Sequence, residues 1–371
     1  MIHSEDDELE LRSLLQVPVH FPLPRIPEYN VPTAEKIDLG RHLFYDKRLS
    51  ANGTQACADC HRQILAFADG EITPTGSTGE ILTRNSQGLG NAMYHATLTW
   101  SNDAFLDLEE QMRVPIQSDS PVELGVTGAH REEVLSRFDD DPMYIVKFSN
   151  AFPNSEPGAS LNKIIHALAS FCRSMISGSS AYDKFLLGDQ NALTEQQKLG
   201  LKLFNGEKFE CFHCHSGINF STSYVDYNSN PATQTYPFFN NGLYNINGTG
   251  DYPEIDQGLY ELTQKSHHRG LFRPQSLRNV ALTAPYMHDG SIETLREVVE
   301  HYVGGGRLIE SGPFAGDGRL SPLKSGFVRN FNATDEEVDA VVAFMESLTD
   351  YEFISDPRFS NPFELSSEAV D

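Results

Sequence analysis

The sequence predicts a mainly α-helical protein made of two similar halves with long ordered loops. Three observations lead to this prediction: a five-residue motif occurs twice, a leucine–glycine pattern precedes each copy, and strand signals are scarce. A length of 371 residues suits two domains of ordinary size. We place these domains at residues 1–180 and 181–371, joined near residues 178–192, where Gly178-Ser179-Ser180 loosens the chain.

The leucine–glycine pattern marks one predicted helix in each half. Leu39-Gly40 lies in a helical pattern over Thr33–Tyr45, and Leu199-Gly200 lies in a second one over Thr194–Phe204. Glycine inside a helix costs about 1 kcal/mol relative to alanine. Its repetition at the same place therefore predicts that another helix approaches closely there. This arrangement resembles the first helix of a cytochrome c domain, and it occurs twice.

Other elements are predicted further along the chain. An apolar-periodic stretch at Leu161–Ser177 predicts a helix in which Cys172 is a buried free thiol. Residues 217–262 are rich in Asn, Gly and Tyr without a clean period, which predicts a long ordered loop. Thr334 is placed to cap a terminal helix, with Glu337 as its capping-box partner.

The repeated motif is Cys57-Ala58-Asp59-Cys60-His61 and Cys211-Phe212-His213-Cys214-His215. Cys-x-x-Cys-His is the attachment site of a c-type haem, with two thioether bonds and the histidine as iron ligand. A zinc site would need the two Cys pairs to converge, and neither it nor a thioredoxin-like motif needs the following histidine. We therefore expect two cytochrome c-like domains, each carrying one covalent c-type haem, and no disulfides.

Composition limits which classes of partner and which cell compartment fit this protein. The 28 basic and 52 acidic side chains give a formal charge of −24, which argues against nucleic acid and anionic lipid as partners. That charge suits a basic electron donor, a protein substrate or simple solubility. Thioether attachment takes place outside the cytoplasm, so we expect a periplasmic protein. Residues 1–7 lack the basic and apolar regions of a signal peptide, so we expect a mature chain without its leader. No apolar run is long enough to span a membrane.

The stretch Asn279–Ser291, with the sequence NVALTAPYMHDGS, is highly distinctive. It resembles the second-domain signature of bacterial dihaem cytochrome c peroxidases and MauG, and the resemblance runs from about Ile26 to Phe363. In the peroxidases a methionine on the following helix ligates the second haem, and in MauG the matching position is a tyrosine. Counting from Pro285, that position falls on Tyr302, which the resemblance therefore implies as the second iron's ligand.

The periodicity of the following helix, predicted over Ser291–Tyr302 and ended by Gly304-Gly305-Gly306, agrees with this assignment. Tyr302 continues the apolar face of Leu295, Val298 and Val299 at positions i, i+3, i+4 and i+7.

Two residues compete with Tyr302 for the second iron. His301 is the main competitor, since imidazole is usually the better iron ligand, but it lies about 100° away around the helix. Met287 or another methionine is the other alternative.

The first haem is expected to have an open iron. Many dihaem peroxidases carry a histidine after the first motif that blocks the iron until the other haem is reduced. The segment Arg62–Tyr94 contains no histidine. His95 comes too late and its surroundings indicate a structural role, which leaves Met93 as the alternative cap. A five-coordinate iron can bind peroxide, whereas a six-coordinate iron passes electrons.

The resemblance also implies residues around the open iron. Trp100, the only tryptophan, corresponds to a residue between the haems; Gln111 and Pro115 correspond to residues lining the open pocket. Glu123 corresponds to a glutamate that acts on bound peroxide, where a carboxylate can take a proton from one oxygen and deliver it to the other. Indole suits the relay because it is the most easily oxidised aromatic side chain.

A calcium ion between the haems is a further implication of the resemblance. The matching positions are Asn85 and the backbone carbonyls of Thr283 and Pro285. Oxygen ligands of these kinds suit calcium.

Several stretches are closer to MbnH-type dihaem enzymes than to MauG, namely residues 76–80, 96–100, 210–217 and 322–329. That branch implies that hydrogen peroxide forms a high-valent, bis-Fe(IV)-type state shared through Trp100. It further implies oxidation of a Trp to kynurenine on an MbnP-like secreted copper-binding protein. The alternatives are a dihaem cytochrome c peroxidase fed by a small cytochrome or cupredoxin, and a non-enzymatic dihaem electron carrier.

Overall fold

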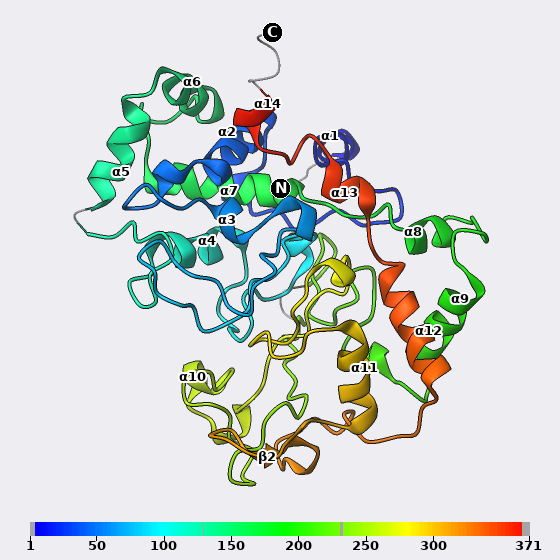
Figure 1. Ribbon diagram of the computed structural model, residues 1–371. Coiled ribbons are helices and arrows are strands. Elements are labelled where there is room, and N and C mark those ends of the chain that lie inside the picture. Colours follow the sequence, from blue (N-terminus) through cyan, green and yellow to red (C-terminus); the bar gives the residue numbers. More distant parts are fainter. Residues whose placement is uncertain (1–3, 129, 231–232, 366–371) are drawn as a thin grey trace.

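The computed structural model describes residues 4–128, 130–230 and 233–365 and shows a mainly helical molecule, as the sequence predicts (Figure 1). Long loops connect the helices, and the strands named within the described part are only two residues each. The helices up to the middle of the chain are α1 Glu5–Leu15, α2 Ala34–Tyr45, α3 Cys57–Cys60, α4 Leu108–Gln117, α5 His130–Asp139, α6 Pro142–Ala151 and α7 Leu161–Ser174. The later elements are α8 Ala181–Leu186, α9 Glu195–Phe204, α10 Tyr260–Thr263, α11 Leu295–Gly304, β1 Leu308–Ile309, β2 Gly316–Asp317, α12 Asp335–Glu346, α13 Tyr351–Ser355 and α14 Pro362–Leu365.

The repeated leucine–glycine pattern corresponds to a repeated helix pair. Helix α2 packs on α7, and α9 packs on α12 in the same way (Figure 1). A Cβ atom added to Gly40 would lie 2.0 Å from the carbonyl oxygen of Ala167, and one added to Gly200 would lie 1.8 Å from that of Ala340. Glycine is therefore required where each pair crosses, which confirms the predicted close approach.

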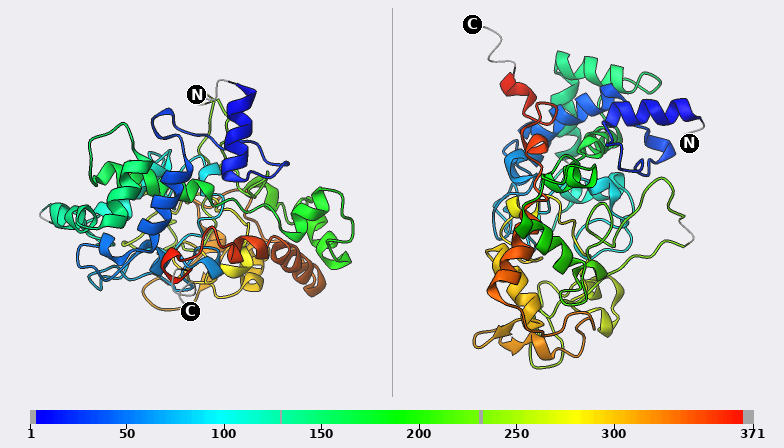
Figure 2. Two further views of the ribbon diagram at one scale, coloured as in Figure 1. Left: turned by 90° about the horizontal axis from the view of Figure 1, so that it is seen from above. Right: turned by 90° about the vertical axis from the view of Figure 1, so that its right-hand side faces the viewer.

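Each half of the chain also has its own apolar core. The first contains Phe44, Phe67 and Phe171, and the second contains Phe204 and Phe344. The division is not strictly sequential, because Phe353 and Phe359 near the end of the chain pack into the first core. Figure 2 shows the helices of the first half gathered at one end and α11 with the β1–β2 hairpin at the other. The boundary at residues 180 and 181 stays a prediction.

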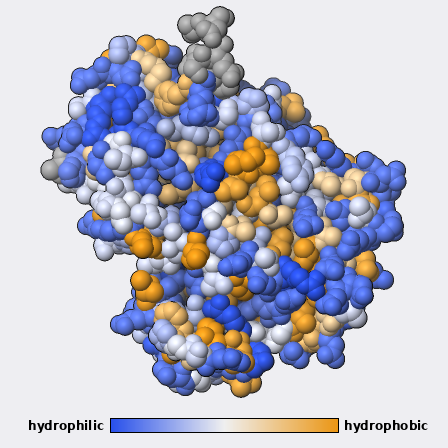
Figure 3. All heavy atoms as spheres, viewed as in Figure 1, coloured by the Kyte–Doolittle hydropathy of each residue, from blue (hydrophilic) through white to orange (hydrophobic). Residues whose placement is uncertain are grey.

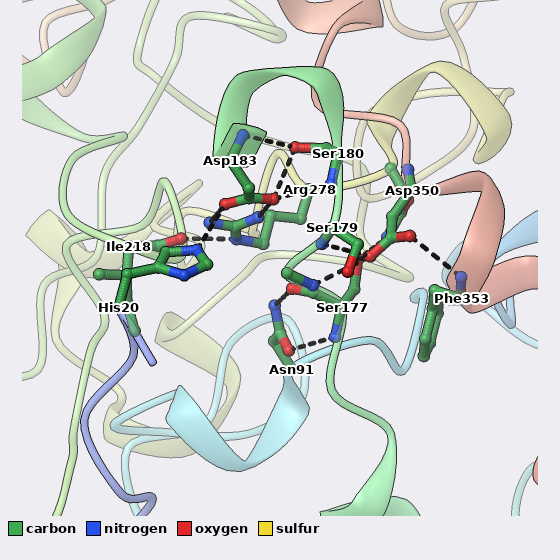
Figure 4. Close-up of polar contacts among 12 residues, drawn as sticks. His20, Asn91, Ser177, Ser179, Ser180, Asp183, Ile218, Arg278, Asp350 and Phe353 are labelled. Atoms are coloured by element: carbon green, nitrogen blue, oxygen red, sulfur yellow. Dashed lines mark hydrogen bonds and ion pairs between the residues drawn. The ribbon is translucent and has the colours of Figure 1, made fainter. Parts of the chain in front are cut away.

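The connector between the halves is held firmly. The carboxylate of Asp350 accepts hydrogen bonds from the Ser177 hydroxyl and from the backbone amides of Gly178 and Ser179 (Figure 4). The expectation that Gly178-Ser179-Ser180 loosens the chain is therefore wrong. The connector is fixed by Asp350, which lies 171 to 173 residues further along the chain, so a local sequence pattern gives no signal of it.

Next to the connector lies a buried ion pair. Arg278 donates two hydrogen bonds to Asp183 at 2.9 and 3.0 Å, and both side chains are at most 1% exposed (Figure 4). His20 contacts the same carboxylate from the N-terminal region at 3.1 Å. Three distant segments therefore meet at one buried charge pair.

The predicted helices differ from the observed ones mainly at their ends. Thr334 caps α12 with Glu337 as its capping-box partner, as the sequence predicts. Thr33 and Thr194, given as the first residues of the predicted helices, are the caps of α2 and α9. Helix α7 ends at Ser174 rather than Ser177, and Cys172 within it is fully buried with no disulfide. Helix α11 begins at Leu295 rather than Ser291, because Thr294 and Glu297 form a capping box there.

The face in Figure 3 is predominantly hydrophilic, with an apolar group of side chains near its middle. Among the described residues, no helix is both long and apolar enough to cross a membrane.

Candidate haem-binding sites

The histidines of the two repeated motifs are held in the same way, each by hydrogen bonding of Nδ1 to backbone carbonyl oxygens. His61 Nδ1 lies 2.7 Å from the carbonyl oxygen of Phe67. His215 Nδ1 lies 3.0 Å from that of Phe220 and 3.1 Å from that of Gln275. A carbonyl only accepts, so Nδ1 carries the proton and Nε2 keeps its lone pair. Burial also lowers the pKa of both histidines, so each is neutral and oriented as an iron ligand requires.

The two cysteine pairs do not converge within the described residues. None of the five cysteines, all within the described residues, is in a disulfide. Burial raises the pKa of Cys60 to about 11 and that of Cys214 to about 12, so both are neutral thiols at neutral pH. Among the described residues, no three His, Cys, Asp or Glu side chains meet as a metal site. The motif geometry therefore fits covalent haem attachment.

A cavity of about 250 Å³ adjoins the second motif. Cys211, Cys214 and His215 line one part of it, and Trp100 and Tyr302 line others. Much of the remaining wall is apolar, which suits a porphyrin. The side chains that the sequence assigns to the second haem thus share one cavity. Cys57, Cys60 and His61 do not belong to its lining.

Tyr302 faces this cavity as the helical period predicts. Leu295, Val298, Val299 and Tyr302 of α11 all line it. Burial raises the pKa of Tyr302 to about 12; the Cys214 thiol adds to this shift, and a hydrogen bond with the Asn241 side chain opposes it. An anionic phenolate ligand would therefore need a cation beside it.

The two competitors of Tyr302 are engaged elsewhere. His301 is not part of the cavity lining, and its Nε2 lies 3.0 Å from the backbone oxygen of Asn241. Met287 lines the cavity, but its sulfur accepts a hydrogen bond of 3.3 Å from the side-chain amide of Asn241. Asn241 therefore contacts all three candidates. Sequence reasoning missed it because it lies in the aperiodic stretch 217–262.

Trp100 lies where the halves meet. It lines the cavity, and its indole N–H donates to the backbone oxygen of Asn85 at 2.8 Å. Its own carbonyl oxygen accepts from the backbone amide of Arg273 at 2.8 Å.

The expected calcium ligands line the same cavity as Trp100. Asn85, Thr283 and Pro285 all belong to its lining. The Asn85 amide nitrogen donates to the carbonyl oxygen of Glu71, which leaves its amide oxygen for a cation. Calcium itself stays a prediction.

Glu123 lies near the first motif, on a segment that is fixed from both sides. The backbone amide of Leu124 donates to the carbonyl oxygen of Pro115, and the carbonyl oxygen of Leu124 accepts from Ala51. Burial raises the pKa of the Glu123 carboxyl to about 7. Burial chiefly raises the pKa values of the Cys57 and Cys60 thiols, and the charge of Glu123 adds to both shifts, so this carboxyl lies close to the cysteines of the first motif.

The other residues assigned to the first site lie on α4 and on the 3₁₀ turn Ala92–Tyr94. Gln111 and Pro115 are four residues apart on α4 and so lie on one face of that helix. His95 is buried with Nδ1 at 3.2 Å from the Ser223 carbonyl oxygen, and Met93 packs in the first core. Gln111, Pro115 and Glu123 are not part of the cavity that holds Trp100.

Known proteins are similar to this chain in sequence and in fold. The model of the di-haem cytochrome c peroxidase family matches residues 34–191. The chain is 33% identical to the cytochrome-c peroxidase IdrP1 of Pseudomonas sp. (strain SCT), over 88% of this chain and 85% of that protein. It is 30% identical to the methylamine utilization protein MauG of Methylorubrum extorquens, over 93% and 86% respectively. A crystal structure of a MauG-like protein associated with microbial copper homeostasis superimposes with a TM-score of 0.91 at 44% identity, over 94% of this chain and 98% of that one.

Proposed function

Because this chain belongs to the dihaem cytochrome c peroxidase and MauG family of haem-dependent oxidoreductases, we propose that it uses hydrogen peroxide to oxidise a protein at long range. The observation that carries this proposal is the position of Tyr302 on the cavity wall beside Cys214 and His215. A phenolate oxygen stabilises iron in its higher oxidation states, whereas a methionine thioether favours the ferrous ion. Tyr302 therefore favours oxidation of a partner over simple electron transfer.

The residues divide into two haem-holding sets. Cys57, Cys60 and His61 would hold the first haem, and Cys211, Cys214 and His215 would hold the second, with Tyr302 as a further ligand of its iron. When bound, the two haems supply peroxide activation and storage of two oxidising equivalents.

The protein's own groups move the proton and the electrons. Glu123 takes a proton from one peroxide oxygen and delivers it to the other, which becomes water. Gln111 and Pro115 shape the space in which peroxide is held. Trp100 passes electrons between the two sites from its fixed position in the cavity wall.

We assign the substrate to a Trp of a secreted, MbnP-like copper-binding protein, which is oxidised to kynurenine in the periplasm. Support comes from the 44% identity to the MauG-like protein associated with copper homeostasis. The formal charge of −24 suits a partner with a basic docking face. Because electrons travel through the protein, the substrate side chain does not need to enter a pocket.

Electron paramagnetic resonance of the resting diferric protein tests this function. One equivalent of peroxide, added without reductant, should remove one high-spin and one low-spin ferric signal without a stoichiometric radical. Conversion of Trp to kynurenine and formate removes four electrons, so it consumes two equivalents of peroxide. In a second experiment with the partner present and at least two equivalents of peroxide, mass spectrometry of the partner should show a Trp that has lost one carbon and gained one oxygen.

The second candidate is a dihaem cytochrome c peroxidase, which the identity to IdrP1 favours. It predicts a spectrum that stays unchanged until one haem is reduced beforehand. It also predicts rapid turnover with a small cytochrome or cupredoxin as electron donor. Either result would overturn the function proposed above.

A further inference from the structure

Arg273 is a buried cation without a counter-ion. Its side chain is 3% exposed, and it lines the main cavity beside the second motif. Nε donates to the carbonyl oxygen of Thr99, and Nη2 donates to the side-chain oxygens of Gln87 and Gln275. All three acceptors are neutral. Within residues 4–128, 130–230 and 233–365, no carboxylate pairs with this guanidinium.

Such an arrangement is costly unless an anion joins it. A buried charge is stable only when it is paired and hydrogen-bonded, and an unpaired one destabilises the fold. Burial lowers the pKa of Arg273 to about 9, which expresses the same cost. The two other arginines that are buried to a similar extent each have a carboxylate partner: Arg173 pairs with Glu109, and Arg278 pairs with Asp183. Arg273 therefore differs from them in lacking its partner.

Two hydrogen-bond donors mark where the missing anion would lie. The Nη1 atom of Arg273 is buried and has no partner among the described residues. The side-chain nitrogen of Gln275, in the same cavity lining, is also buried and unpartnered. The Gln275 oxygen already accepts from Arg273 at 2.8 Å, so the two side chains are held next to each other. A guanidinium with an adjacent amide is a pair of donors suited to a carboxylate.

We propose that Arg273 and Gln275 bind a carboxylate inside the main cavity, and that this carboxylate is a propionate of the second haem. The identity of the carboxylate rests on the proposed dihaem function. The backbone of Gln275 supports it, because its carbonyl oxygen also contacts Nδ1 of His215, the proximal histidine of that haem. One residue thus orients the histidine with its backbone and a carboxylate with its side chain.

This site has a consequence for Trp100. The backbone amide of Arg273 donates to the carbonyl oxygen of Trp100, so the guanidinium is anchored to the relay residue. A bare positive charge there would make the indole harder to oxidise. A bound carboxylate neutralises that charge and so keeps Trp100 usable as an electron relay.

The test uses the mature dihaem protein and measures the reduction potential of the second haem by spectroelectrochemical titration. Arg273→Gln removes the charge and should shift the potential downward, because the ferric state is then no longer opposed by a nearby cation. Arg273→Lys should keep the potential close to that of the unmodified protein. Arg319→Gln, which removes an exposed arginine paired with Asp317, is the matched control and should shift nothing.

Gln275→Leu gives a second, milder variant in case Arg273→Gln loses haem. It should lower the potential by a smaller amount, since it removes one neutral donor. If Arg273→Gln binds both haems and has the same potential as the control, the carboxylate site is overturned. If Arg273→Gln does not bind its haems, Gln275→Leu decides, and a potential equal to that of the control overturns the site.

Acetate distinguishes the source of the carboxylate. If a propionate occupies the site, adding acetate leaves the potential of the unmodified protein constant. If the potential moves with acetate and Arg273→Gln abolishes that movement, a free carboxylate binds there and the propionate is the wrong occupant. None of these measurements uses peroxide or a partner protein, so their failure is distinguishable from failure of the proposed function.

Discussion

The indole N–H of Trp100 donates a hydrogen bond to the backbone oxygen of Asn85 at 2.8 Å. The backbone amide of Asn85 in turn donates to the carbonyl oxygen of His288, and that of Arg273 donates to Trp100. Segments from both halves of the chain therefore fix the indole. A relay between two sites needs this fixed orientation, because electron transfer depends steeply on the placement of the groups involved.

Trp100→Phe tests the relay. Phenylalanine keeps an aromatic ring but is far harder to oxidise, so the two oxidising equivalents can no longer be shared. After one equivalent of peroxide, we expect the high-spin ferric signal to disappear while the low-spin signal persists. Oxidation of the partner should slow by about tenfold or more, equivalent to at least 1.4 kcal/mol in the barrier. Collapse of both signals, as in the unmodified protein, would exclude Trp100 as the relay.

Asn241→Leu tests how Tyr302 is tuned. The Asn241 side chain opposes the raised pKa of Tyr302 and holds the sulfur of Met287. Removing it should raise the pKa of Tyr302 further, so that the phenolate spectrum of the diferric protein develops only at higher pH. A pH titration of the visible spectrum measures this shift. Asn205→Ala, at the end of α9, is the control, and identical titrations in both variants would contradict the assignment.

The raised pKa of the Glu123 carboxyl leads us to expect a pH-dependent reaction with peroxide. The carboxylate takes the first proton, and burial places its pKa at about 7, so the reaction should accelerate as the pH rises through that value. Stopped-flow rates from about pH 5.5 to about pH 8.5 measure the dependence. Glu123→Gln should slow the reaction by about 10²- to 10⁴-fold and flatten the profile. A profile that keeps its shape in this variant would assign the proton transfer to another group.

The buried pair of Asp183 and Arg278 predicts a pH-dependent stability. Asp183→Asn leaves a buried guanidinium without its counter-ion, which should cost about 3–5 kcal/mol in the free energy of unfolding. Burial alone would raise the pKa of Asp183, but Arg278 and the hydrogen bonds outweigh it and hold the pKa below its ordinary value.

The sign of the pH effect follows from that lowered pKa. The stabilisation is present above the unfolded pKa of about 4 and is lost as the pH falls through the folded value. Urea unfolding should therefore show a large difference between the two proteins at neutral pH and a smaller one in acid. Asp189→Asn, at an exposed position, should match the unmodified protein at both pH values.

The local and periodic features could be predicted from the sequence. Gly40 and Gly200 predict the two close helix crossings, because only glycine, which has no Cβ atom, lets the two backbones approach so closely. Tyr302 lines the cavity because its position in the helical period puts it on the same face as Leu295 and Val299. Both predictions depend only on residues within a few turns of one another.

Features built from distant contacts could not be predicted in this way. Asn241 and Arg273 lie in stretches without a period, and their roles depend on neighbours that the chain brings together only after folding. Asp350 likewise fixes a connector that looks flexible in sequence. The roles of Gln111, Pro115 and Glu123 stay predictions, because they depend on a cofactor and a substrate.

The packing of α13 and the residues that follow it has a consequence for how the protein is assembled. Phe353 and Phe359 pack against the ring of Phe67, with ring centroids 5.6 and 6.4 Å apart. The carbonyl oxygen of Phe67 is the group that orients His61. The site of the first motif is thus supported by residues that follow the second motif in the chain. A chain truncated after residue 350 should still contain the first attachment motif, yet its proximal histidine would lack its backing.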